Sequence, residues 1–349
     1  MLAWLSHALA GWWGPLRLFD SYFFLASAGF AVSAASAFLL LPRLAGLLPR
    51  DGGRAFAVNA EQSVGKPVGA GLIFVSLFAA LSLVFVHLGS TPVRTLPVML
   101  AAMVVGFLDD RRPGGFSEYA LGAMDLGLAL AAACLIYGFG KTTMWLPIIT
   151  QAFTVPAFVA IPLGTAVVWL SINATNCSDG VDGVSGSLTA VAILLLGGLL
   201  YTVIGNDVVA GHLRIPASRE GADWSIMALL MAGCLAGYLW YNAPPSSLLM
   251  GDAGSRPLGL LIGMLVLATN NPLFIAIIGP VILLNGATGL VKVALIRFLG
   301  VRILQRIRFP LHDHCRKELG WSNSQVLVRF FLLHVAVSSL LVVIALKIR

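Results

Sequence analysis

The chain has 349 residues, of which 58% are hydrophobic and only 11% are charged, and its formal net charge is +7. Soluble domains usually carry about 25% charged residues, so this composition excludes a water-soluble domain with an ordinary charged surface. The excess of Lys and Arg does not indicate nucleic-acid binding, because these residues stand between apolar runs and form no single basic face. We expect them to orient the chain in a lipid bilayer, and we expect no nucleic acid among its partners.

Ten apolar runs divide the chain into segments that could each form a helix. A bilayer core is about 30 Å thick, so a spanning helix needs about 20 apolar residues. The chain leaves room for short loops but not for a large soluble domain, and we expect one integral membrane domain over residues 1–349. The predicted fold is all-α, with about ten transmembrane helices near residues 22–41, 69–88, 93–108, 119–139, 155–170, 186–203, 224–240, 257–268, 273–290 and 326–345.

The basic residues predict how these spans are oriented. With ten spans, both termini lie on one side of the membrane and the loops alternate between the two sides. The loops after the odd-numbered runs hold about 14 of the 22 Lys and Arg residues, and the termini and remaining loops hold about 7. The positive-inside rule therefore predicts cytoplasmic odd-numbered loops and periplasmic termini. These same loops hold every acidic or histidine cluster in the chain that we consider functional, whereas chance would scatter such clusters over both sides.

The first cluster is a pair of adjacent carboxylates, Asp109 and Asp110, in the sequence GFLDDRR that ends the third run. Two like charges beside a low-dielectric region are costly, and a metal or a cationic partner would relieve that cost. One carboxylate could hold Mg²⁺ or a lysine, while the other accepts a proton from an acidic phosphate hydroxyl. The alternative is a solvated loop in which Arg111 and Arg112 neutralise the pair.

The second cluster is the loop NATNCSDGVDGVSG at residues 173–186. Its glycines allow tight turns, and its Asn and Asp side chains offer oxygen ligands or hydrogen bonds to a ribose and a base. It lacks the order of acidic residues found in a calcium-binding loop. A purely structural loop is the alternative. The candidate binding residues here are Asn173, Asn176, Asp179 and Asp182.

The third cluster is MGDAGS at residues 250–255, in which Asp252 lies between glycines. Such glycines let the backbone approach a phosphate or a metal closely, although a plain turn that carries an Asp is also common. Asp252 is therefore a candidate metal ligand whose sequence context alone is weak evidence.

The fourth cluster is PLHDHCRK at residues 310–317, which contains His312 and His314 and follows three arginines. Imidazole and guanidinium donors together suit the oxygens of a diphosphate. The two histidines lack the further ligands that a zinc site needs. The alternative is a basic juxtamembrane loop that binds anionic lipid head groups.

Together the four clusters offer carboxylates for Mg²⁺, polar groups for a nucleoside and cations for a diphosphate, all at a membrane surface. This set favours Mg²⁺-dependent phosphoryl transfer between a soluble nucleotide donor and a lipid acceptor. It disfavours a transporter, whose acidic residues are expected in the middle of the spans.

At these residues the chain resembles the polyprenyl-phosphate N-acetylhexosamine-1-phosphate transferases, and among them the phospho-N-acetylmuramoyl-pentapeptide transferases. The resemblance covers most of the chain and implies ten spans, outward termini, a bacterial cytoplasmic (inner) membrane and an active site that faces the cytoplasm. It rests on residues 1–5 (MLAWL), the pair at 109–110, the loop at 173–183, and the sequences at 251–255, 310–314, 320–321 and 328–330.

The resemblance implies that undecaprenyl phosphate attacks the β-phosphate of UDP-MurNAc-pentapeptide, which gives lipid I and UMP for peptidoglycan synthesis. By the same resemblance Asp252 is the leading Mg²⁺ ligand, and Asp109 activates the lipid phosphate with support from Asp110. A homodimer in the lipid bilayer is likewise expected from the resemblance. The implied substrate-binding residues are Asn173, Asn176, Asp179, Asp182, Leu249, His312, His314 and Lys66.

The sequence departs from the family pattern at several positions that touch donor recognition more than the metal site. Leu249 stands where the family usually has a Phe that stacks on uracil, and Asp313 replaces the middle histidine of three. Asn285 stands in place of an acidic residue, and near Lys66 a Ser-Lys-Arg-Gly segment becomes QSVG at 62–65. Two alternatives therefore stay open: a related transferase that uses another UDP-N-acetylhexosamine for a different surface polymer, and a degenerate paralogue without activity. Whether the reaction takes one step or two also stays open.

Overall fold

The computed structural model describes residues 2, 14–53 and 63–349, and its fold is mostly helical. Most of the MLAWL motif and Gln62 lie outside the described residues. The longer helices are α2 (Tyr22–Leu44), α3 (Gly71–Phe85), α5 (Leu96–Arg111), α6 (Glu118–Tyr137), α7 (Ala157–Cys177), α8 (Val184–Leu199), α10 (Gly221–Asn242), α11 (Asp252–Ala268), α14 (Thr288–Leu299) and α16 (Asn323–Lys347). The shorter ones are α4 (Thr91–Arg94), α9 (Asp207–His212), α12 (Phe274–Ile278), α13 (Pro280–Ile282) and α15 (Leu311–Lys317).

Each of the ten predicted apolar runs falls on helical structure. In the described part of the chain, 8 helical segments are long and apolar enough to cross a membrane. The two runs that fall short are those on α3, with 15 residues, and on α11, with 17 residues. The structure therefore supports eight candidate spans, and the predicted number of ten is not confirmed by helix length and composition.

The prediction of an all-α fold is wrong at one place, where β1 (Lys141–Leu146) and β2 (Ile149–Pro156) form an antiparallel hairpin. Both strands are rich in Thr, β-branched and aromatic residues, which favour extended backbone. The hairpin also takes the first two residues of the predicted run at 155–170, because α7 begins only after Pro156. Arg349 anchors the hairpin to the end of α16, since it donates to the carbonyls of Leu146 and Ile149 and lies over the ring of Trp145.

The predicted run at 273–290 is a broken helix that continues further than expected. It consists of α12, α13, a π-helical segment, η5 (Leu283–Ala287), and α14. The break at Gly279 and Pro280 follows from the missing N–H of proline. Because α14 ends at Leu299, Lys292 and Arg297 lie on a helix and not in the loop to which the charge count assigned them.

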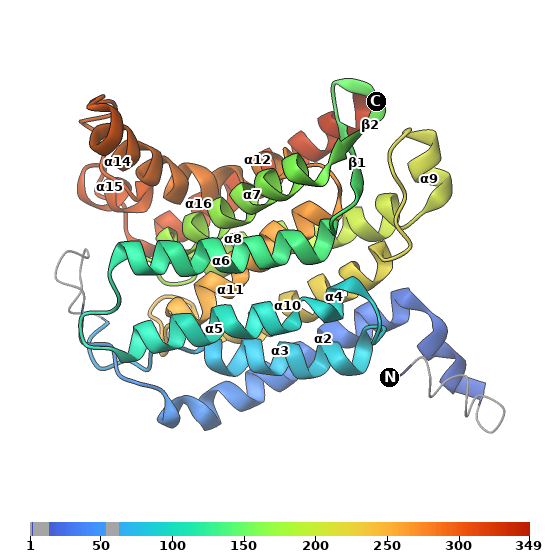
Figure 1. Ribbon diagram of the computed structural model, residues 1–349. Helices are drawn as coiled ribbons and strands as arrows, with labels where there is room; N and C mark the ends of the chain where they lie inside the picture. Colours follow the sequence, from blue (N-terminus) through green and yellow to red (C-terminus); the bar gives the residue numbers. More distant parts are fainter. Residues whose placement is uncertain (1, 3–13, 54–62) are drawn as a thin grey trace.

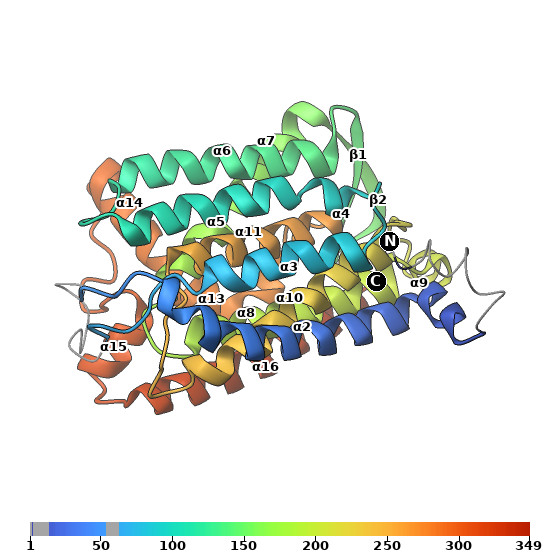
Figure 2. The same ribbon diagram turned by 90° about the horizontal axis from the view of Figure 1, so that it is seen from below.

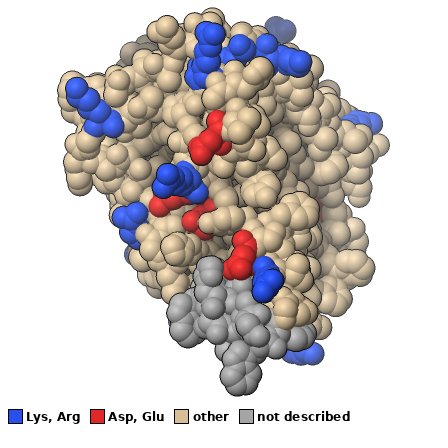
Figure 3. Space-filling model, turned by 90° about the vertical axis from the view of Figure 1, so that its right-hand side faces the viewer, with Lys and Arg blue, Asp and Glu red and all other residues tan. Residues whose placement is uncertain are grey.

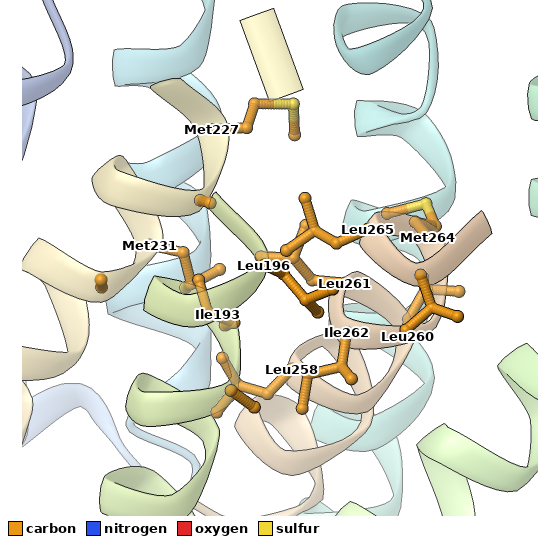
Figure 4. Close-up of a cluster of buried hydrophobic side chains, with 14 of the residues drawn as sticks. Ile193, Leu196, Met227, Met231, Leu258, Leu260, Leu261, Ile262, Met264 and Leu265 are labelled. Carbon is orange, nitrogen blue, oxygen red and sulfur yellow. The ribbon is translucent and has the colours of Figure 1, made fainter. Parts of the chain in front are cut away.

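The hydrophobic core surrounds α11, which packs against α3, α5, α6, α7 and α8. Every residue of α11 is buried, as expected for a helix that is apolar on all sides. Figure 4 shows leucines of α11 such as Leu258 and Leu261 beside Leu196 of α8 and Met231 of α10. Helix α7 approaches closely at Gly259, where a Cβ atom would lie 2.6 Å from the Cα of Ile172. Small residues allow such approaches in membrane proteins.

The helices run roughly parallel to one long axis, so the molecule has two ends (Figures 1 and 2). One end carries the hairpin, α9, the 3-10 helix η1 (Gly14–Asp20) and the C-terminal Arg349. Figure 3 looks onto that end, where acidic side chains gather near the middle and basic ones lie around them. The opposite end carries α14, α15 and the C-terminal ends of α5 and α7. The predicted functional clusters lie at this second end.

Candidate active site

The site is built around the N-terminus of α11, which two other helices approach closely. A Cβ atom on Gly106 of α5 would lie 2.1 Å from the carbonyl oxygen of Asp252, and one on Gly71 of α3 would lie 2.1 Å from the backbone nitrogen of Gly254. Only glycine fits at such distances. Gly106 therefore lets the last turn of α5, with its two carboxylates, lie beside the first turn of α11, and Gly71 lets the start of α3 approach the same turn.

Asp110 caps α11. Its Oδ1 accepts a hydrogen bond from the backbone N–H of Asp252 at 2.9 Å, and its Oδ2 accepts one from Ala253 at 3.0 Å. The first N–H groups of a helix have no partner within the helix, and a negative charge is favourable there. The residue at the N-cap position is Gly251, which has no side chain to fill this role. Asp110 thus supports Asp252 through the backbone.

We expect an Asp110→Ala variant to lose about 1–3 kcal/mol of unfolding free energy, because two buried N–H groups of α11 lose their charged acceptor. Thermal or denaturant unfolding of the detergent-purified protein measures the loss. Asp110→Asn is the matched control, since its one carbonyl oxygen can keep one of the two bonds and the loss should be smaller. An alanine variant as stable as the wild type would contradict the capping role.

Asp252 is held by a buried ion-pair network that the sequence analysis did not predict. Its Oδ2 accepts hydrogen bonds from Nε and Nη2 of Arg256, at 3.0 and 2.8 Å. Nη1 of Arg256 pairs with Oδ2 of Asp125 on α6 at 2.5 Å. Asp252 is 6% exposed, Arg256 is 3% exposed and Asp125 is fully buried. A signal existed, because Asp125 is the one acidic residue inside the run at 119–139, and an ionisable residue within a span suggests a function.

Asp109 lies beside this network at the end of α5. Its Oδ1 accepts the backbone N–H of Phe116 at 2.5 Å, so the turn after the helix folds back over the carboxylate. It interacts electrostatically with Asp252 and Arg256. When all four side chains are ionised, the three carboxylates and one guanidinium carry a net charge of −2. The arrangement suits a divalent cation and a carboxylate that can accept a proton.

The loop at 173–183 contributes to the same region through the C-terminal end of α7. Nδ2 of Asn176 donates to Oγ of Ser255 on α11 at 2.9 Å. Nδ2 of Asn173 donates to the carbonyl oxygen of Trp169, one turn earlier on α7. Asp179 lies in the turn after α7, where its backbone N–H donates to the carbonyl oxygen of Asn176. Asn176 is thus the residue of this loop that links directly to the helix of Asp252.

Lys66 and Asp182 form a second cluster with the loop that precedes α11. Nζ of Lys66 lies 4.0 Å from Oδ2 of Asp182 and donates to Oγ of Ser246 at 3.0 Å. Asp182 also accepts the backbone N–H of Ser246. Asn242, which the sequence analysis missed, ties this loop down: its Oδ1 accepts from the N–H of Gly183, and its Nδ2 donates to the carbonyl of Leu248. Its position at the end of an apolar run gave no distinguishing signal.

Leu249 lies between these two groups of residues with its side chain half-buried. Its backbone N–H donates to the carbonyl of Pro67 at 2.8 Å, and its carbonyl accepts from Ala70 at 3.1 Å. The backbone of Leu249 therefore joins the segment that holds Lys66 to the segment that leads into Asp252.

His312 lies on the other side of the 173–183 loop and is buried. Its backbone N–H and its Nδ1 both approach Oδ1 of Asn285, at 2.9 and 3.1 Å, so Nδ1 carries the proton. A Cβ atom on Gly180 would lie 2.3 Å from Nε2, so the ring rests directly on this glycine. Burial, with a smaller effect from the Arg316 charge, lowers the pKa of His312 to about 3. His312 is therefore a neutral hydrogen-bonding group at neutral pH.

His314 contacts the preceding basic segment, where its Nδ1 lies 3.5 Å from the backbone nitrogen of Arg308. Asp313, between the two histidines, lies 3.6 Å from Arg316 and 3.8 Å from both Arg308 and His312. The residue that departs from the family pattern therefore anchors two arginines at this edge of the site.

The lowered pKa of His312 predicts a dependence of stability on pH. The unfolded chain takes up a proton on this imidazole below about pH 6.5, whereas the folded chain does so only near pH 3. The contribution to stability is thus complete above about pH 6.5 and is lost as the pH falls toward 3. Between pH 7.5 and pH 5 we expect this group to remove about 2 kcal/mol of unfolding free energy.

A His312→Gln variant should lack this part of the acid sensitivity in unfolding experiments at the two pH values. His314→Gln is the matched control and should keep the sensitivity of the wild type. Equal sensitivity of the wild type and the His312→Gln variant would show that His312 is not held neutral by burial.

A cavity of about 1000 Å³ leads away from the site between α6, α7 and α14. Asn173, Asn176 and Arg256 line it near the carboxylates. Its other walls are mostly apolar and include Leu126 of α6 and Phe298 of α14. Phe298 is 77% exposed, so the cavity borders the outer surface of the helices. A long apolar group that carries a polar head would fit this shape.

The structure brings Asp109, Asp110, Asp252 and Asn176 together, and it places Lys66, Asp182 and the histidines in adjacent clusters. Across residues 14–53 and 63–349, no three His, Cys, Asp or Glu side chains are grouped closely enough to hold a metal ion by themselves. A metal at this site would therefore need ligands from bound substrate or water.

Comparisons with known proteins show which family the chain is similar to. A family model described as glycosyl transferase family 4 matches residues 93–270. The chain is 44% identical over 338 residues to the phospho-N-acetylmuramoyl-pentapeptide-transferase of Treponema pallidum (strain Nichols), which covers 95% of this chain and 92% of the relative. It is 27% identical over 344 residues to the protein of the same name from Bartonella quintana (strain Toulouse), which covers 95% of this chain and 96% of the relative.

Proposed function

The chain belongs to the phospho-N-acetylmuramoyl-pentapeptide transferases of glycosyl transferase family 4, and on this premise we propose that it makes lipid I for peptidoglycan synthesis. In this reaction the phosphate oxygen of undecaprenyl phosphate attacks the β-phosphate of UDP-MurNAc-pentapeptide. The bond between the β-phosphorus and the oxygen that it shares with the α-phosphate breaks, and UMP leaves with that oxygen. The observation that carries the proposal is the 44% identity over 95% of the chain.

The cavity between α6, α7 and α14 is our proposed site for the polyprenyl chain of the acceptor. Its walls are mostly apolar, and it reaches from the outer surface at Phe298 to Arg256 and Asn176 beside the carboxylates. An acceptor in this cavity would present its phosphate to the region of Asp109. Asp109 would then accept the proton of that phosphate, or orient it, before attack on the donor.

Mg²⁺ fits the residues at the start of α11. The cluster of Asp109, Asp125, Asp252 and Arg256 has a formal charge of −2, and Oδ1 of Asp125 is buried without a hydrogen-bond partner among the described residues. Mg²⁺ commonly takes one or two carboxylates and completes its coordination with water and substrate phosphates. Asp252 is the proposed ligand, with Asp109 beside it. When bound, Mg²⁺ would offset the charge of the diphosphate and of the departing UMP.

The donor is proposed to occupy the side of the site formed by Lys66, Asp182 and the loop at 246–250, with the uracil near Leu249 and Asp182. Asn173, Asn176 and Asp179 would border its diphosphate. His312 is neutral at working pH, so it would act there as a hydrogen-bonding group, while Arg316 and Arg308 supply positive charge nearby. His314 would contribute from the edge of the site.

We expect a Leu249→Phe variant to bind the uridine donor more tightly, because an aromatic ring can stack on uracil where leucine cannot. Stacking of a base on an aromatic side chain contributes roughly 1–3 kcal/mol, which corresponds to about 5- to 150-fold in affinity. The dissociation constant of UDP-MurNAc-pentapeptide, measured by calorimetry, tests this. A Leu249→Met variant is the apolar control, and unchanged affinity in Leu249→Phe would contradict the proposed uracil position.

The proposed location is the bacterial inner membrane, with ten spans in a single domain over residues 1–349, both termini periplasmic and the active site cytoplasmic. Two features support the topology: the clusters lie opposite the end that carries Arg349, and their end is the one rich in basic loops. Alkaline phosphatase fused after Arg349 should be active, because alkaline phosphatase is active only when it folds in the periplasm.

A homodimer is also proposed, and the mass of the detergent-solubilised protein tests it.

The lipid product tests the proposed substrate. We expect mass spectrometry of a lipid extract to show undecaprenyl-diphospho-MurNAc-pentapeptide after incubation with undecaprenyl phosphate, Mg²⁺ and the muramyl donor. With UDP-GlcNAc as the donor we expect no lipid-linked sugar. The opposite pattern would identify a related transferase for another surface polymer.

A further inference from the structure

The network that joins Asp125, Arg256 and Asp252 is placed where it can control the geometry of the reaction. The three side chains come from two helices, α6 and α11, and all are buried. The Arg256 guanidinium donates two N–H groups to Oδ2 of Asp252 and a third to Oδ2 of Asp125. The planar guanidinium of Arg256 thereby holds the Asp252 carboxylate in one orientation, and Asp125 on α6 holds the guanidinium.

Stability alone does not explain such a network. The three charged groups lose their hydration on burial, and replacement of buried ion pairs by apolar residues is often neutral or stabilising. If stability alone were at stake, apolar residues at positions 125, 252 and 256 would fill the same buried space without this cost. The network orients Asp252 and balances its charge, and both matter where a cation and a diphosphate are to be bound.

On the basis of the proposed function, we propose that Asp125 and Arg256 are positioning residues for the reaction. Arg256 clamps one oxygen of Asp252 so that the carboxylate is aimed at the metal. Asp125 holds the guanidinium in place and compensates its charge, so that the cluster of Asp109, Asp125, Asp252 and Arg256 has a formal charge of −2.

Arg256→Lys tests the positioning role directly. Lysine keeps the charge but has no planar fork, so it cannot hold Asp252 and Asp125 in the same geometry. We expect kcat to fall about 100-fold, as a 1 Å misplacement of a reacting group can produce. The KM values of both substrates should stay within about twofold of the wild type. Unchanged kcat would overturn the proposal, and so would a raised KM for undecaprenyl phosphate with normal kcat, which would make Arg256 an acceptor-binding residue.

Binding of Mn²⁺, used in place of Mg²⁺ and followed by electron paramagnetic resonance, gives a readout that does not depend on turnover. Asp125→Asn changes the formal charge of the cluster from −2 to −1, and we expect Mn²⁺ to bind about tenfold more weakly. The double variant Asp125→Asn/Arg256→Gln returns the charge to −2 and should bind Mn²⁺ within about threefold of the wild type. Its kcat should stay low, because the clamp is gone.

The double variant leaves Asp252 without its guanidinium partner, so its unfolding temperature is measured beside that of Arg256→Lys, which keeps a cation next to Asp252. Normal kcat in a folded double variant would overturn the positioning role. Equal Mn²⁺ affinity in the wild type and Asp125→Asn would overturn the charge balance. If the wild-type chain transfers no phospho-sugar, the proposed function fails, while the Mn²⁺ affinities of the two variants still decide the charge balance.

Discussion

Replacement of Asp252 by alanine is expected to lower kcat for lipid I formation at least about 10³-fold, which corresponds to about 4 kcal/mol of transition-state stabilisation. A bound divalent cation supplies several kcal/mol when charge moves onto a leaving phosphate, and Asp252 is its proposed ligand. The carboxylate is buried at the start of α11, where Asp110 caps the backbone and Arg256 holds Oδ2. A water molecule in the space left by the side chain would not reproduce its charge.

The loss should be one of activity and not of folding, because Arg256 keeps its second partner, Asp125, in the Asp252→Ala variant. Asp207→Ala is the matched control, since Asp207 is also a carboxylate in the first turn of a helix, but it is exposed at the opposite end of the molecule. The measurement is single-turnover transfer with radiolabelled donor. Wild-type kcat in a folded Asp252→Ala protein would contradict the assignment of the metal ligand.

Asp109→Asn is expected to lower kcat about 10²–10⁴-fold, the range that general acid–base catalysis contributes. The asparagine oxygen can still accept the N–H of Phe116, so the turn after α5 should keep its shape. What the variant loses is the ability to accept a proton from the acceptor phosphate, and the charge beside Asp252. The KM of the donor should change little, and steady-state kinetics with varied donor and acceptor checks this.

The neighbouring residue supplies the contrast for this prediction. Asp110 accepts two backbone hydrogen bonds from α11, so Asp110→Asn should mainly lower stability, with a smaller effect on kcat. If kcat fell more for Asp110→Asn than for Asp109→Asn, with both proteins folded, this would contradict the proposed roles. Asp110 would then be the catalytic carboxylate and not mainly a cap of α11.

Much of the fold could be predicted from the sequence, because burial in a bilayer or in a protein core requires the same apolar side chains. All ten apolar runs fall on helices for this reason. The count of spans was harder, since α11 is enclosed by other helices and a short helix can be fully buried without the length of a span. The β1–β2 hairpin was missed because strand pairing depends on partners that hydrophobicity does not record.

The sequence predicted most residues of the candidate site but not the hydrogen bonds and ion pairs between them. Asp109, Asp110 and Asp252 were identified from charge beside apolar runs. The sequence could not separate the roles of the first two, because the cap that Asp110 forms joins residues 142 positions apart. The ion pair of Asp125 and Arg256 could be predicted only if α6 and α11 were known to face each other. The lone carboxylate inside the run at 119–139 was the available signal for that pair.

Release of UMP by the detergent-purified protein tests whether the chain transfers phospho-MurNAc-pentapeptide. The reaction would contain undecaprenyl phosphate, UDP-MurNAc-pentapeptide and Mg²⁺, with parallel reactions that contain a chelator, the Asp252→Ala variant or UDP-GlcNAc. We expect UMP from the wild type with the muramyl donor, and loss of that signal in each of the three parallel reactions. UMP released only from UDP-GlcNAc, or no UMP from either donor, would contradict the proposed function.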